Sequence, residues 1–439
     1  MRWTRVVGVL LAVPWLVGVA AAHEVPGGRL DAPLPLPLLF AGAGFTVAAT
    51  ACWFARDDHT VDERERRQVE VPWLPLGRHL LRAVGLVGFA GVLWFGLFGL
   101  QVAADNPATL FAWAVALKGV GLVAVVAGSP WRSLSPWRTA YDAFVALEGD
   151  ELARFDYPDW LGVWPAVVGF VLLVGVTENL TGIPQSPRLT AGVLAAYAVL
   201  MLLGGLAFGR TFFDRADALA VLYALLGRVS PLEWRERGVV VRPPWAACAR
   251  TPSTPGVAAF VVAAVYTVTF DGFSNSPEYQ TVYFALRDAT GAVTPLALYV
   301  AGLAAFLVAF AVVALAADRL GSGRSVRGAA AAFAPTVVPI AAAYEVAHNY
   351  SFVARNLSQL LSLVDGVSVS LLGWLPLSAF WWSQVALVVA GHLLAVAAAH
   401  LVVSARYGKH AGRAHAPLVA LMVGYTVLSL WVVSRPVVT

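Results

Sequence analysis

Long runs of apolar residues, separated by shorter polar segments, dominate the pattern along this chain. Ten of these runs have about the length that an α-helix needs to cross the ~30 Å hydrocarbon core of a bilayer. The pattern therefore predicts an all-α fold, a polytopic transmembrane helical bundle of about ten spans. The predicted spans are 36–54, 83–102, 108–128, 161–178, 190–209, 256–271, 295–316, 332–352, 380–403 and 416–434.

The first 22 residues have the pattern of a secretory signal. Arg2 and Arg5 form a charged start, a run of apolar residues follows, and three alanines ending at Ala22 satisfy the small-residue cleavage rule. We expect cleavage after Ala22, which makes His23 the new N-terminus and leaves residues 23–439 as a single integral membrane domain. An uncleaved first helix is the alternative.

Basic residues alternate from one loop to the next. The basic loops hold 22 of the 30 Arg and Lys residues, and the segments on the opposite side hold only five. The positive-inside rule then places the basic loops in the cytoplasm and both mature termini on the extracytoplasmic side of the cell membrane. The predicted cytoplasmic loops are 55–82, 129–160, the extended loop at 210–255, 317–331 and 404–415.

Composition agrees with this interpretation, because 59% of the residues are hydrophobic and only 13% are charged. An ordinary soluble domain has about 25% charged residues. The partner that the composition implies is the lipid bilayer. The net charge of +4 does not point to nucleic acid, since the basic residues act as topology signals between apolar runs. Cys52 and Cys248 face the predicted cytoplasm, which favours free thiols.

Ionisable residues inside the eighth predicted span are the main candidates for function. Glu345 and His348 are three residues apart, so they share one face of a helix, and Tyr344 and Asn349 lie beside them. A charged group at membrane depth costs several kcal/mol and marks a functional site by default. The pattern predicts an ion or proton site here.

His392 and Lys118 lie at similar predicted depths, roughly 15–18 Å from the cytoplasmic ends of their spans. Lys118 can pair with Glu345, either to neutralise both charges or as part of a proton-coupled step with histidine as the relay. A haem held by His348 and His392 is a further alternative. Periodicity alone does not show which of these side chains face one another.

Two features of the predicted cytoplasmic loops also stand out. Ser129–Arg138 repeats the motif Ser-Pro-Trp-Arg, and its two tryptophans suit anchors at the level of the lipid headgroups. The alternative is that its two arginines bind an anion. Asp214–Arg228 places leucines on one helical face, which predicts a helix lying on the membrane surface or packed under the bundle.

Several short motifs resemble those of bacterial and archaeal membrane proteins often labelled fenitrothion hydrolase. The resemblance extends over most of the chain and includes its histidine-bearing last helices. The motifs are Ala22-His23, Gly28–Pro35, Pro136–Arg138, Tyr157-Pro158, Leu161–Pro165, Phe213–Arg215 and Phe270–Ser274. The label implies hydrolysis of organophosphate-type esters, but it brings no established catalytic residues with it.

Hydrolysis of such an ester requires an activated water and a polarised P=O bond, which a divalent metal supplies. His23, Asp271, Glu345 and His348 are the candidate ligands, all predicted toward the outer half of the membrane, and they suit Zn²⁺ or a similar ion. An N-terminal histidine also offers its amine and imidazole together as a copper-type chelate. Asp271 alternatively ends its short span as a simple helix cap.

Three functions follow from these features. The first is a transporter or carrier of a small molecule or ion, with Lys118, Glu345, His348 and His392 as its polar site. The second is a metal-dependent membrane hydrolase with its site at the outer mouth. The third is a structural or assembly protein whose polar groups only lock helix packing. The sequence leaves open whether the protein is an enzyme.

Overall fold

The computed structural model describes residues 35–56, 68–250, 254–321, 323, 325–366 and 369–435. Most of this part of the chain is helical, which confirms the predicted all-α bundle. The predicted signal, residues 1–22, and the candidate ligand His23 lie outside the described residues, as do the mature termini.

Eight long helices form most of the described part of the chain, and two further apolar stretches there are built from shorter pieces. The long helices are α2 (Leu36–Arg56), α3 (Leu74–Phe98), α9 (Pro187–Phe208), α13 (Pro255–Ser274), α15 (Thr294–Gly321), α17 (Val338–Asp365), α18 (Leu377–Tyr407) and α19 (Ala411–Val433). The composite stretches are α4 (Pro107–Thr109) with η3 (Leu110–Gly119) and α5 (Val120–Ala127), and α8 (Trp164–Phe170) with η5 (Val171–Glu178).

By length and composition, eight helical stretches of the described chain can cross a membrane. One of them, Leu377–Val433, contains both α18 and α19, and the apolar helix Trp164–Glu178 is shorter than the rest. Each of the ten predicted ranges overlaps one of these helices. The helices therefore fit a polytopic membrane protein, and the number of crossings stays a prediction.

Shorter elements connect these helices. They are η2 (Ala103–Asp105), α6 (Trp131–Leu134), α7 (Pro136–Glu148), η4 (Asp159–Leu161), η6 (Ile183–Gln185), α10 (Arg210–Arg215), α11 (Ala218–Leu226), α12 (Ala246–Arg250), α14 (Pro277–Thr290), η7 (Gly291–Val293), α16 (Val326–Phe333), η8 (Ala334–Val337) and η9 (Gly408–His410). The strands are β1 (Gln68–Glu70), β2 (Leu232–Trp234) and β3 (Gly238–Val241). The predicted loop at 210–255 is thus largely folded.

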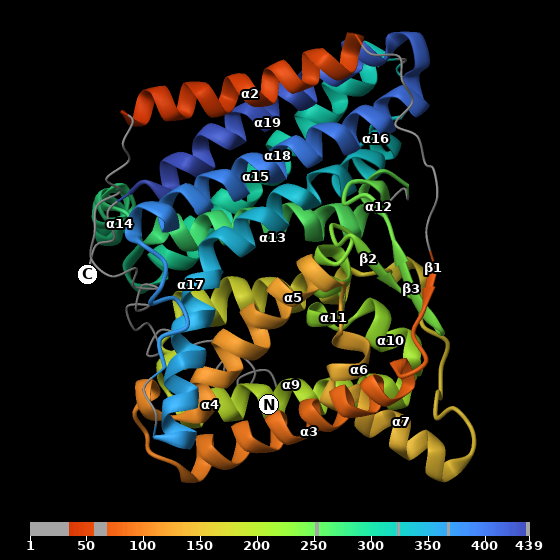
Figure 1. The fold of residues 1–439 in the computed structure, drawn as a ribbon, viewed down its shortest axis with the longest axis vertical. Helices are drawn as coiled ribbons and strands as arrows, with labels where there is room; N and C mark the ends of the chain where they lie inside the picture. Colours follow the sequence, from red (N-terminus) through yellow and green to blue (C-terminus); the bar gives the residue numbers. More distant parts are fainter. Residues whose placement is uncertain are drawn as a thin grey trace.

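The long helices run in two groups with α17 across both. In Figure 1 α2, α13, α15, α18 and α19 fill the upper part and α3, α7 and α9 the lower part. Helix α17 packs on α18 in the first group and on η3 in the second. Gly391 on α18 allows this helix to lie close to α17. A Cβ at this position would lie only 2.7 Å from the Pro339 carbonyl oxygen on α17.

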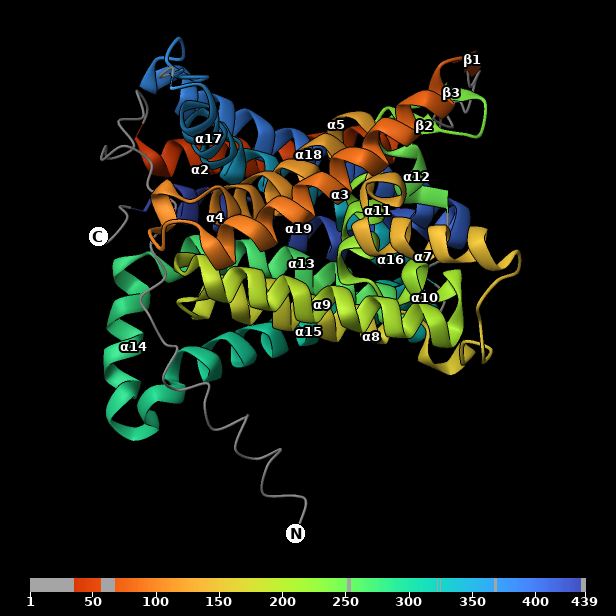
Figure 2. The same cartoon turned by 90° about the horizontal axis from the view of Figure 1, so that it is seen from below.

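A small antiparallel sheet in the order β1-β3-β2 joins two loops that the charge pattern places on one side. Val69 pairs with Val239, and Glu233 pairs with Val240. The sheet lies at one end of the bundle, and α14 lies at the opposite end (Figure 2). An ion pair of 3.1 Å between Arg82 and Asp142 brings the 129–160 loop to the same end. Which end faces the cytoplasm stays a prediction.

Candidate functional site

Lys118 lies in the interior of the bundle between two carboxylates. Its Nζ atom is 3.1 Å from Oε1 of Glu178 and 3.9 Å from Oε1 of Glu345. The three side chains are 6%, 5% and 11% exposed, respectively. The predicted pairing of Lys118 with Glu345 is therefore present. The shorter contact is to Glu178, a residue that the sequence pattern does not mark as part of a site.

Lys118 and Glu178 both lie near the end of a π-helical segment. Lys118 is the ninth of ten residues in η3, and Glu178 is the last residue of η5. π-Helical turns are rare, appear mostly as single turns, and occur frequently at functional sites. Here two such segments carry the two partners of one ion pair, Lys118 on η3 and Glu178 on η5.

The Tyr223 hydroxyl of α11 supports η3 directly before Lys118. It lies 2.9 Å from the carbonyl oxygen of Ala116 and 2.8 Å from that of Leu117, and its single proton can be donated to one of them at a time. Tyr223 is fully buried. The described part of the 210–255 loop thus reaches into the bundle as far as the backbone that carries Lys118.

A second pair of ionisable side chains lies between α13 and α17. Nε2 of His348 is 3.0 Å from Oδ2 of Asp271, and the two side chains are 20% and 10% exposed. The His348 ring also stacks on Tyr344, with ring centroids 6.0 Å apart. Asp271 therefore has a partner on another helix, which the helix-cap interpretation of this residue does not include.

A cavity of about 210 Å³ connects the two pairs. Glu178 and Asp271 both line it, and Ala104 and Gln185 at its other side are exposed. Because Glu178 and Asp271 line the same cavity, the two pairs belong to one cluster around it. The remaining lining residues are Ala103, Thr109, Leu110, Trp113, Asn179, Pro184, Asn275, Phe352 and Asn356.

Two acids of this cluster share one cation. The carboxylates of Glu178 and Glu345 both face the single ammonium group of Lys118. Oε2 of Glu178 is buried and makes no hydrogen bond in the described structure, and Oε1 has the Lys118 ammonium group as its partner. A buried charge without compensation is strongly destabilising, so the cluster favours uptake of a further positive charge.

His392 does not join this cluster, although its span and depth suggested that it could. Its Nδ1 atom is 2.8 Å from the carbonyl oxygen of Val388, and its ring lies 5.9 Å from the ring of Tyr425. It makes no hydrogen bond or ion pair with Lys118 or Glu345. Because His348 and His392 lie in these separate surroundings, the arrangement does not resemble two axial ligands of one haem.

Asn349 and Tyr344 flank Glu345 and His348 as the helical spacing predicts. The Asn349 side chain donates a 3.2 Å hydrogen bond to the backbone carbonyl of Glu345, and its own oxygen is buried without a hydrogen-bond partner among the described residues. The buried Tyr344 hydroxyl likewise makes no hydrogen bond there. Both side chains therefore keep unused hydrogen-bonding capacity inside the bundle.

The four candidate metal ligands are only partly brought together. Asp271 and His348 are paired, Glu345 faces the Lys118 ammonium instead, and His23 lies outside the described residues. Within the described residues, no group of three or more His, Cys, Asp or Glu side chains could hold a metal ion. The four-residue metal centre therefore stays a prediction.

The Ser-Pro-Trp-Arg repeat forms a second buried polar cluster. The indole N–H groups of Trp131 and Trp137 donate to Oδ2 of Asp217 at 3.1 and 2.8 Å, and the Tyr197 hydroxyl donates to Oδ1 at 2.9 Å. Two backbone N–H groups of α11 also donate to Oδ1. The tryptophans are buried, so their predicted role as headgroup anchors is wrong.

The two arginines of the repeat bind a carboxylate of the chain itself. Arg138 and Arg132 lie 2.6 and 3.6 Å from the carboxylate oxygens of Asp214. The repeat therefore binds both acids of the Asp214–Asp217 segment through its tryptophans and arginines, and it fixes the position where α11 starts. Helix α11 is mostly buried and packs on α5, α8 and α17, so it does not lie on the surface of the bundle. Asp214 takes the place of the free anion of the alternative interpretation.

The position of Glu178 in the sequence does not indicate that it belongs to a site. It lies at the end of a predicted span, directly before the triplet Asn179-Leu180-Thr181, which matches a glycosylation acceptor and so suggests an exposed loop. Asn179 is in fact buried, and its side chain donates to the carbonyl of Val174 at 2.6 Å. A lone acid at a span end was the available signal.

Comparisons with known proteins give no relative for this chain. No family model, no curated protein and no solved structure matches it.

Proposed function

We propose that this protein is a proton-coupled membrane carrier whose exchange site is formed by Lys118, Glu178 and Glu345. The observation that carries the proposal is the cavity of about 210 Å³, because it touches Glu178 and Asp271 and extends to exposed residues. It offers a route between the surface and the two buried carboxylates that share the Lys118 ammonium group. On the charge-based topology, this route opens to the extracytoplasmic side.

The two distances from Lys118 suggest how exchange would work. Lys118 is closer to Glu178, at 3.1 Å, than to Glu345, at 3.9 Å. A proton that binds Glu178 removes its attraction for the ammonium group, and Lys118 then pairs with Glu345. A proton suits this site better than a metal cation, because the ammonium group repels a second cation.

Asp271 and His348 are the proposed relay between the cavity and the exchange site. Their side chains are less deeply buried than those of Lys118 and Glu178, and Asp271 lines the same cavity as Glu178. Histidine exchanges protons near neutral pH, and the carboxylate of Asp271 orients its ring. His392 has no part in this mechanism.

The test is proton uptake by purified protein in liposomes that contain the pH dye pyranine. A potassium diffusion potential drives the flux. We expect uptake by the wild-type protein, loss of most of it in Glu178→Gln and in Glu345→Gln, and wild-type uptake in Lys409→Met, which changes the one other lysine of the chain. Uptake that is absent in the wild type, or unchanged in both glutamate variants, contradicts the proposal.

Hydrolysis of organophosphate-type esters is a second candidate function. It rests on the resemblance to proteins labelled fenitrothion hydrolase and on the Asp271–His348 pair beside the cavity, since a histidine held by a carboxylate can act as a general base. Release of 4-nitrophenol from a phosphotriester by the purified protein, and its loss in His348→Ala but not in His410→Ala, would favour this function over transport.

A further inference from the structure

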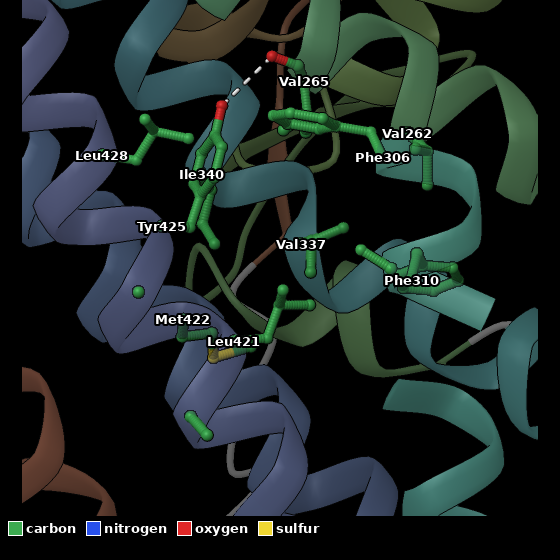
Figure 3. Close-up of a pocket in the computed structure, with 13 residues that line it drawn as sticks. Val262, Val265, Phe306, Phe310, Val337, Ile340, Leu421, Met422, Tyr425 and Leu428 are labelled. Carbon is green, nitrogen blue, oxygen red and sulfur yellow. Dashed lines mark hydrogen bonds between the residues drawn. The ribbon is translucent and has the colours of Figure 1, made fainter. Parts of the chain in front are cut away.

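A large apolar cavity lies between α13, α15, α17 and α19, away from the charged cluster. Its volume is about 360 Å³ (Figure 3). Side chains from all four helices surround it, together with one from η8. The lining residues are Val262, Val265, Phe306, Ala309, Phe310, Val337, Ile340, Ala420, Leu421, Met422, Gly424, Tyr425 and Leu428. We propose that this cavity holds one acyl chain of a bilayer phospholipid.

The walls of the cavity have almost no groups that can form hydrogen bonds with water. The Tyr425 hydroxyl is the one side-chain oxygen among the lining residues, and it already donates toward the carbonyl oxygen of Val265 at 3.1 Å and contacts the Thr269 hydroxyl. A buried water needs two to four polar partners, whereas an apolar cavity of about 150 Å³ can stay dry and bind benzene. A cavity of this size and lining therefore suits a hydrocarbon ligand.

The cavity opens at a face where hydrocarbon is present. Ala309 on α15 and Ala420 and Gly424 on α19 line it, and all three are exposed. A Cβ added at Gly424 would have no heavy atom within 4 Å, so this edge is open space. Both helices belong to stretches that can cross a membrane, and lipid tails would lie directly at this opening.

A second apolar cavity of about 240 Å³ continues the first one toward the end of α19. The two cavities share Phe306 and Leu428, and the second one reaches Trp431 and Val432. The distance along α19 from Ala420 to Val432 is about 18 Å at 1.5 Å per residue. That length is close to one leaflet, which is half of the ~30 Å hydrocarbon core. One acyl chain matches it.

A basic and aromatic pair at the far end suits the lipid headgroup. The Arg435 guanidinium lies 4.9 Å from the centre of the Trp431 ring and 2.8 Å from a carboxylate oxygen of Glu278. Tryptophan concentrates at the level of the headgroups, and arginine binds phosphate. The acyl chain would lie in the two cavities with the phosphate near Arg435. The proposed ligand is therefore a phospholipid and not a free hydrocarbon.

The test uses a phosphatidylglycerol with a diazirine near the end of one acyl chain, added to the purified protein in bilayer nanodiscs. After illumination, the cross-linked peptides are identified by mass spectrometry. The test variant Ala420→Leu/Gly424→Leu fills the opening from the outside. The control is Gly192→Leu on α9, where the added side chain also enters open space on an exposed face, but on a helix that lines neither of the two apolar cavities.

We expect cross-links concentrated on lining residues of α13, α15 and α19 in the wild type and in Gly192→Leu. The yield should fall about tenfold in Ala420→Leu/Gly424→Leu, as expected when burial of two or more methylene groups is lost. An unchanged midpoint of thermal unfolding shows that this variant is folded. Cross-links spread evenly over the exposed helices, an unchanged yield in the filled variant, or coverage of this face by a second copy of the chain would overturn the proposal.

Discussion

Two clusters in this molecule bury a carboxylate, and they compensate the cost of burying its charge in different ways. Asp217 accepts hydrogen bonds from two indoles, one phenol and two backbone N–H groups. Glu178 faces one ammonium group through Oε1, and its Oε2 has no hydrogen bond within the described structure. A carboxylate surrounded by fixed donors is a structural anchor, whereas one with a spare oxygen, a cavity and a second acid nearby can exchange a proton.

The largest expected effect comes from removing the cation that both acids of the exchange site share. Lys118→Met leaves Glu178 and Glu345 buried without their common partner, which should destabilise the protein by about 3–5 kcal/mol. The midpoint of thermal unfolding in detergent measures this loss. The double variant Lys118→Met/Glu178→Gln should recover part of it, and a double variant that is no more stable than Lys118→Met would show that the two side chains are not coupled.

Removing the Asp217 carboxylate should destabilise the protein slightly less than Lys118→Met does. It should also leave the residues of the exchange site unchanged. Asp217→Ala leaves five donors without their acceptor, and we expect a loss of about 3 kcal/mol in the free energy of unfolding. Asp150→Ala, at an exposed position, is the matched control. By contrast, Glu178→Gln should keep or raise the thermal midpoint while it abolishes proton uptake. Equal destabilisation by both changes would erase the difference between the two clusters.

Tyr223 links the two clusters, because Asp217 caps the start of α11 and Tyr223 of the same helix reaches the backbone beside Lys118. Tyr223→Phe removes one hydrogen bond and should lower the free energy of unfolding by about 1 kcal/mol. It should also change the pH profile of proton uptake, since the position of Lys118 relative to Glu178 depends on η3. A stability loss without any change in that profile would confine Tyr223 to a structural role.

The smallest effect concerns Cys248, which lies outside the candidate spans in α12. Burial raises the pKa of its thiol to about 12, so the thiolate that reacts with maleimide is scarce below that pH. We expect no labelling of Cys248 in the folded protein at pH 7 to 9 and rapid labelling after unfolding. Labelling of the native protein at pH 7 would show that this part of the bundle opens.

The same inert thiol makes a topology test simple. In a Cys52→Ser background, a membrane-impermeant maleimide should label Asp150→Cys only from the cytoplasmic side and Asp288→Cys only from the outside. Both positions are exposed, and they lie at the ends of the bundle that carry the 129–160 loop and α14. Labelling of both from the same side would reject the charge-based topology.

The length of the apolar runs was enough to locate the long helices, because a span of membrane length has a strong signal. The pairing of Lys118 with Glu345 also followed from two lone charges at similar depth. Glu178 and the separation of His392 from the site did not, since the direction of a side chain depends on local helix geometry. A π-helical segment such as η5 turns its last residues away from the direction that an α-helix predicts.

The Trp131 and Trp137 positions show a related limit. Tryptophan beside arginine at the end of a span is typical of a headgroup anchor. Here both indoles turn inward to an acid that lies about 80 residues later in the sequence, and that contact has no local signature. Long-range polar contacts of this kind require the tertiary structure, whereas the helices themselves do not.

Infrared difference spectroscopy of the reconstituted protein tests the central claim most directly, because protonated and ionised carboxyl groups absorb at separate frequencies. The account predicts a buried protonated carboxyl that appears on mild acidification and disappears on return to higher pH. Its signal should be lost in Glu178→Gln and retained in Asp150→Asn. A wild-type protein with no titrating buried carboxyl, or a signal that survives in both Glu178→Gln and Glu345→Gln, would contradict an exchangeable proton at this site.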